Sequence, residues 1–143
     1  MASEATAAIT TGGCLCGAVR YEISGPLRDV IACHCRQCRR ATGHYYAATA
    51  VKRHYLTLTE TRGLRWYQSS STARRGFCAM CGSNLLWDAA QYPHVSITAG
   101  SLDDDSNLRL VRHIFVAEQG GYYVLADGVT QVAGRAHGIS VPD

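Results

Sequence analysis

Seven cysteines in a chain of 143 residues constrain its fold more than any other feature. They form a Cys-x-Cys pair, a dense cluster and a Cys-x-x-Cys pair, at Cys14 and Cys16, at Cys33, Cys35 and Cys38, and at Cys78 and Cys81. An odd number leaves at least one cysteine outside any set of internal disulfides. The first ten residues also lack the basic start and apolar core of a secretory signal. The sequence therefore predicts a cytoplasmic protein whose reduced thiols bind metal.

Composition places the chain among folded domains and excludes several kinds of partner. Hydrophobic residues make up 47% and charged residues 17%, which is enough apolar material for a core. The formal net charge of +3 comes without a basic tail, so we expect no nucleic-acid partner. No apolar run is long enough to cross a membrane, and we expect no membrane partner. We predict a flexible N-terminus over residues 1–10 and a single domain over residues 11–143, with the oligomeric state left open.

Short stretches with alternating or β-branched residues, bounded by turn residues, predict a mainly β domain. The expected strands cover residues 18–24, 30–32, 45–51, 56–59, 64–68, 85–87, 94–99, 108–116 and 122–125. No segment shows a sustained helical period, and the only helix we expect is a turn or two at residues 36–42.

The cysteine spacing suits zinc, which prefers four thiolate or imidazole ligands in a tetrahedron. Seven ligands divide naturally into four and three. Cys14, Cys16, Cys78 and Cys81 could close one site, while Cys33, Cys35 and Cys38 would leave a coordination position open, as catalytic zinc sites do. The spacing also allows the dense cluster to recruit one more group and leave the other site incomplete.

The segments around the cysteines are distinctive in themselves. They run over residues 12–21, 33–43 and 76–83, with weaker matches at residues 99–103 and 112–116. In this order and spacing they resemble the glutathione-dependent formaldehyde-activating enzyme family, which includes relatives of centromere protein V. The resemblance covers residues 11–131. It departs near the end, where Tyr122 precedes a segment at residues 127–131 that lacks the proline, and the preceding tryptophan, often found in the family.

The resemblance implies a fold, an ion content and an activity. The fold would be the Mss4-like arrangement of small antiparallel sheets stapled by zinc. There would be two zinc ions per chain, a structural one on Cys14, Cys16, Cys78 and Cys81 and a catalytic one on Cys33, Cys35 and Cys38. The activity would be that of a carbon–sulfur lyase that joins glutathione, or a similar small thiol, to formaldehyde or a related small aldehyde.

Several side chains near the dense cluster are candidates for supporting roles. Arg36, Arg39 and Arg40, and the pair at residues 74–75, could bind the two carboxylates of glutathione, or could be solvated arginines that balance the thiolates. His34 lies between two candidate ligands and is expected to point away from their metal, since neighbouring side chains diverge on extended backbone. His113 could cap the open position, shuttle a proton or be structural. A binding module without turnover is the alternative to an enzyme, because fold does not dictate function.

Overall fold

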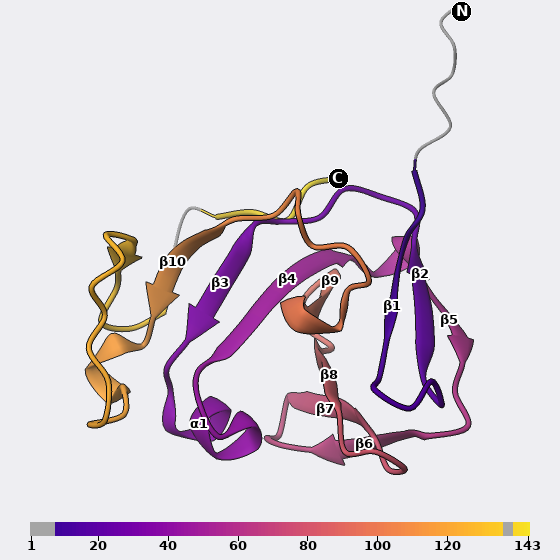
Figure 1. Cartoon of the computed structure of the whole chain (residues 1–143), viewed down its shortest axis with the longest axis horizontal. Helices are drawn as coiled ribbons and strands as arrows, with labels where there is room; N and C mark the ends of the chain where they lie inside the picture. The colour runs from indigo at the N-terminus through magenta and orange to yellow at the C-terminus, as the bar shows by residue number, and fades with distance from the viewer. Residues whose placement is uncertain (1–7, 136–138) are drawn as a thin grey trace, which may run out of the picture.

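Two β-sheets organise residues 8–135 and 139–143, which are the residues that the computed structural model describes (Figure 1). The first is antiparallel and three-stranded, in the order β1-β2-β5, and consists of β1 (Thr10–Gly13), β2 (Arg20–Ile23) and β5 (Leu56–Glu60). Most of the expected flexible N-terminus, residues 1–7, lies outside the described residues.

The second sheet has eight strands in the order β11-β10-β3-β4-β9-β8-β7-β6. Its members are β3 (Val30–Cys33), β4 (Tyr46–Lys52), β6 (Leu64–Gln68), β7 (Ala73–Cys78), β8 (Asn84–Ala89), β9 (His94–Thr98), β10 (Leu110–Ile114) and β11 (Thr130–Gln131). The pairs β10–β3 and β10–β11 are parallel, so this sheet is mixed. The family resemblance had implied antiparallel sheets, and this detail is therefore wrong for the eight-stranded sheet. The other pairs are antiparallel.

Short helices complete the described elements. The α-helix α1 (Arg36–Thr42) follows β3 directly, and three single turns of 3-10 helix are η1 (Arg53–Tyr55), η2 (Ala99–Ser101) and η3 (Val116–Glu118). Figure 1 shows α1 at the end of β3, on the side where β6 and β7 lie. The helix predicted at residues 36–42 is confirmed.

Eight of the nine predicted strands are found, and one is wrong. Residues 122–125 form no strand, and Tyr122 and Val124 are exposed instead. Three strands were missed, namely β1, β7 and β11. The glycines of β1 are required by packing, because a Cβ on Gly12 would lie 2.3 Å from the Tyr21 hydroxyl oxygen.

The main core lies between the two sheets. Tyr21 and Ile23 enter it from β2, and Leu86 and Ile97 enter it from β8 and β9. Two cysteines, Cys14 and Cys78, belong to the same buried cluster. The core therefore continues directly into the place where the first and last cysteine pairs meet.

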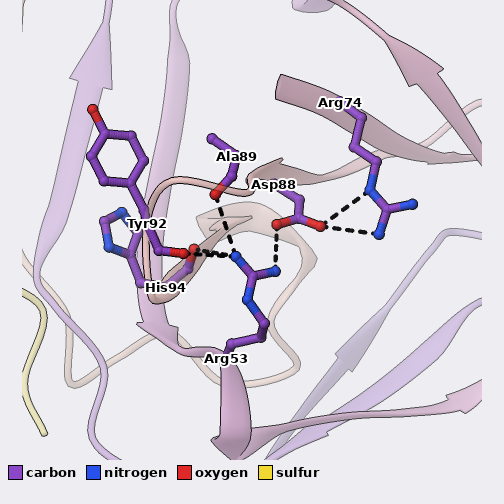
Figure 2. Close-up of polar contacts among 6 residues, drawn as sticks. All are labelled: Arg53, Arg74, Asp88, Ala89, Tyr92 and His94. Carbon is purple, nitrogen blue, oxygen red and sulfur yellow. Dashed lines mark hydrogen bonds and ion pairs between the residues drawn. The ribbon is translucent and has the colours of Figure 1, made fainter. Parts of the chain in front are cut away.

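A cluster of ion pairs stabilises the part of the eight-stranded sheet around β7 and β8. Asp88 on β8 accepts hydrogen bonds from Arg53 in η1 and from Arg74 on β7 (Figure 2). Arg53 also donates to the backbone carbonyl of Tyr92, at 2.8 Å, and so reaches the β8–β9 turn. Asp88 is 8% exposed, whereas both arginine side chains are nearly half exposed. One carboxylate thus joins the segment that follows β4 to β7 and β8.

Replacement of this carboxylate should cost stability. We expect Asp88→Asn to lower the free energy of unfolding by about 1–2 kcal/mol, because it breaks charge-assisted hydrogen bonds whose arginine partners are partly screened by water. Urea unfolding followed by circular dichroism measures the change. Asp105→Asn, at an exposed position, is the matched control. Equal midpoints for the two variants would contradict the role given to Asp88.

Candidate metal and thiol site

Four sulfur atoms from two distant segments meet beside the core. Cys14 and Cys16 lie in the β1–β2 connection, Cys78 ends β7, and Cys81 lies in the β7–β8 connection. Their sulfurs all lie within 4.8 Å of one another, and Cys16 Sγ is 3.7 Å from Cys14 Sγ and 3.8 Å from Cys78 Sγ. Zinc–sulfur bonds of about 2.3 Å place the sulfurs of a tetrahedron about 3.8 Å apart. The observed spacing therefore fits zinc.

The backbone around this group is built to present sulfur. Gly17 and Gly82 adopt positive φ angles of 86° and 83°, which turn the chain directly after each cysteine pair. The Val19 N–H donates to Cys14 Sγ at 3.2 Å. The side chain and backbone of Ser83 hydrogen-bond to the Cys81 sulfur and lower its pKa to about 5. A thiolate is thus favoured at Cys81 near neutral pH, which is the form that binds a cation.

The other three cysteines lie on one short segment. Cys33 ends β3, Cys35 caps the N-terminus of α1 with its sulfur, and Cys38 lies in the first turn of that helix. The three sulfurs lie within 4.8 Å of one another. The helix is stopped at Gly43, whose φ of 84° lets its N–H reach the Arg39 carbonyl. No contact with a distant segment is needed to bring these sulfurs together.

Crowding of these thiols shows why the group suits a cation. Hydrogen bonds from the thiols of Cys33 and Cys38 lower the pKa of Cys35, and the same contacts raise the pKa of Cys33. Ionisation of Cys35 is therefore favoured over ionisation of Cys33, and a cation between the sulfurs would favour the thiolate form of all three. All seven cysteines lie in the described residues, and none of them forms a disulfide. Each group could hold a metal ion.

A buried arginine lies against the three-cysteine group. Arg75 on β7 is 5% exposed, and its Nη2 donates to Cys38 Sγ at 3.4 Å and to Gln37 Oε1 at 3.1 Å. Arg74 and Arg75 do not act as one pair, because successive residues of a strand face opposite sides. Arg74 therefore pairs with Asp88, and of the two arginines it is Arg75 that contacts a cysteine.

The three arginines predicted to bind glutathione all lie on α1. Arg36 and Arg40 are exposed, and Arg39 is partly buried with its Nε shielded from solvent. The helix places them next to Cys35 and Cys38 in the sequence. Their role in binding a thiol stays a prediction.

A chain of hydrogen bonds that the sequence did not reveal starts at His34. Its Nδ1 bonds the Tyr123 hydroxyl at 2.5 Å, its Nε2 bonds His113 Nδ1 at 2.8 Å, and His113 Nε2 bonds Asp127 at 2.8 Å. Burial lowers the pKa of His34 to about 4, which keeps its ring neutral. At the other end of these hydrogen bonds, the Asp127 carboxylate accepts the Nε2 proton of His113.

These hydrogen bonds bear on the roles considered for the two histidines. Both ring nitrogens of His34 are engaged away from the cysteines that flank it, as expected for a side chain that points away from their metal. Both ring nitrogens of His113 are also engaged, which leaves neither of them free to cap the open metal position. Tyr123 and Asp127 were missed because nothing in their spacing connects them to residue 34.

Comparison with known proteins agrees with this geometry. The model of the family described as glutathione-dependent formaldehyde-activating enzyme matches residues 9–118, a range that includes all seven cysteines. The chain belongs to this family. A crystal structure of a Rhodobacter sphaeroides protein is 23% identical, covers 85% of this chain and 98% of that one, and superposes with a TM-score of 0.57.

These findings confirm two expectations. The family predicted from the cysteine motifs is the right one, and the fold is mainly β, in agreement with the Mss4-like arrangement. Within residues 8–135 and 139–143, none of the helices has the length and apolar character needed to cross a membrane.

The four-cysteine group should be essential for stability because it ties the β1–β2 hairpin to the β7–β8 hairpin. We expect Cys81→Ser to remove about one metal ion per chain and to lower the melting temperature by roughly 10 °C or more. Elemental analysis and calorimetry measure the two effects. Met80→Ser, at an exposed neighbouring position, is the control. A Cys81→Ser protein with full metal content and an unchanged melting temperature would contradict this role.

Loss of the three-cysteine group should be milder, because its sulfurs all come from residues 33–38. We expect Cys35→Ala to remove the second metal ion and to lower the melting temperature by less than half as much as Cys81→Ser does. The same two measurements apply. Global unfolding as severe as that of Cys81→Ser would show that the cysteines do not divide as four and three.

Proposed function

We propose that this member of the family is a zinc-dependent carbon–sulfur lyase. It joins a small thiol, glutathione or one like it, to formaldehyde or a related small aldehyde. The observation that carries the proposal is the three-cysteine group with the buried guanidinium of Arg75 at its side. Three sulfurs leave room for one further ligand on a tetrahedral zinc ion. Membership in a formaldehyde-activating family supports the choice of reactants.

The proposal assigns two zinc ions to each chain. Cys14, Cys16, Cys78 and Cys81 would hold a structural ion, and Cys33, Cys35 and Cys38 would hold a catalytic one. Zinc bound at the second group would supply a Lewis acid that lowers the pKa of a coordinated thiol. A cytoplasmic location would keep these cysteines reduced.

The chain's own residues would manage charge and position. Arg75 offsets the negative charge that accumulates when three thiolates and an incoming thiolate share one place. Arg36, Arg39 and Arg40 would bind the carboxylates of the thiol along α1. The reaction itself forms one bond between sulfur and the aldehyde carbon. The thiol proton ends on the former carbonyl oxygen, and the lyase direction reverses both changes.

Thiol binding can be tested by exchanging zinc for cobalt. We expect glutathione to change the sulfur-to-cobalt charge-transfer absorption of the wild-type protein and to release a proton, since the thiol must ionise. Binding should weaken as the pH falls, because protons compete for the same sulfur. S-methylglutathione, which cannot ionise, is the ligand control, and Cys35→Ala is the protein control.

The result also decides between an enzyme and a zinc-stapled binding module. If glutathione and its S-methyl analogue act equally, or neither changes the spectrum, no thiol enters the cobalt site and the proposed function fails. The binding module, with its second group saturated by the protein, would then account for the same cysteines.

A further inference from the structure

The segment that follows β10 contacts the residues on both sides of Cys35. Phe115, directly after β10, turns the chain with a φ of 55°, in the left-handed region that residues other than glycine rarely adopt. The chain then runs through η3 towards β11. Two side chains of this segment, from Glu118 and Tyr123, reach the two residues that flank Cys35.

The first contact holds the residue before Cys35. The Tyr123 hydroxyl lies 2.5 Å from His34 Nδ1, and His113 Nδ1 lies 2.8 Å from His34 Nε2. The His34 side chain is completely buried, and its backbone N–H donates to the last carbonyl of β10 at 3.0 Å. Residue 34 is therefore held by its ring and by its backbone, and the chain enters Cys35 from a fixed position.

The second contact holds the residue after Cys35. Arg36 is the first residue of α1, and its backbone N–H donates to Glu118 Oε1 at 3.0 Å. The first N–H groups of a helix have no partner within the helix, so a side-chain oxygen that accepts one of them stabilises the start of the helix. Glu118 therefore fixes the point at which the chain leaves Cys35.

Cys35 depends on these contacts more than the other two cysteines of its group do. Cys33 belongs to β3 and Cys38 to α1, whereas Cys35 lies between the two elements as the N-cap of the helix. A tetrahedral zinc ion requires the three sulfurs at set distances from one point. Residues that orient metal ligands from outside are known to change metal affinity when they are substituted.

We propose that Tyr123 and Glu118 are positioning residues that hold Cys35 in place for a zinc ion at the three-cysteine group. The inference rests on the proposed function, to which it adds a supporting segment more than 80 residues away in the sequence. Both side chains act through the neighbours of Cys35 and bind no metal themselves. The segment after β10 would thus set how tightly the candidate catalytic zinc is held.

The test measures zinc binding by the two cysteine groups in competition with a chromogenic chelator. Cys35→Ala, which keeps only the four-cysteine group intact, identifies the zinc ion that belongs to each group. We expect Tyr123→Phe to weaken zinc binding at the three-cysteine group by about tenfold and to leave the four-cysteine group unchanged. Tyr122→Phe is the matched control, because its hydroxyl bonds His44 and not His34.

Glu118 gives a second variant at an exposed position, which decides the question even if Tyr123→Phe fails to fold. Glu118→Ala should weaken zinc binding at the three-cysteine group several-fold. Glu118→Gln keeps an oxygen that can accept the Arg36 N–H, and should bind zinc as wild type does. The ligand-field absorption of the cobalt protein should change in Glu118→Ala and stay the same in Glu118→Gln, which reports the geometry at the sulfurs directly.

The outcomes separate this inference from the proposed function. Unchanged zinc binding in the folded variants, equal weakening of both cysteine groups, or an equal effect of Tyr122→Phe would overturn the inference even if glutathione enters the cobalt site. Selective weakening of the three-cysteine group would support it even if glutathione leaves the cobalt spectrum unchanged. A wild-type chain that binds a single zinc ion would overturn both.

Discussion

The convergence of Cys14, Cys16, Cys78 and Cys81 is the constraint on which the rest of the structure depends. It joins the three-stranded sheet to the edge of the eight-stranded sheet, and two of its members also belong to the main core. β1 is only four residues of threonine and glycine, so this strand adds little apolar surface to the core itself. A cation between the four sulfurs would therefore do what a larger core does in other domains.

Once the two sheets are joined, one face of β6–β8 lies under α1 and receives the second cysteine group. That group is formed locally, but its charge is balanced from a distance by Arg75, which is 37 residues from Cys38 in sequence. The same strand gives Arg74 to the Asp88 contact on its other face (Figure 2). β7 thus supplies a stabilising ion pair on one side and the positive charge of the candidate site on the other.

The parts of the molecule that the sequence predicts are those that depend on neighbouring residues. The spacing of Cys33, Cys35 and Cys38 and the glycine at 43 define the dense cluster and its helix without any tertiary contact. β7 was missed because a buried arginine is expected only when its partner is known, and that partner is Cys38. Tyr123 was predicted within a strand, yet its hydroxyl is held by His34 across 89 residues. No local pattern encodes such a pair.

The parallel pairing of β3 with β10 has a consequence for the order in which the protein is assembled during synthesis. The three sulfurs of residues 33–38 are available as soon as that segment leaves the ribosome, and the four-cysteine group is complete only after residue 81. β10, which flanks β3 and carries His113, follows later still. Contacts between such distant segments form slowly. The candidate catalytic loop is therefore exposed to metal and thiols before the strand that supports it exists.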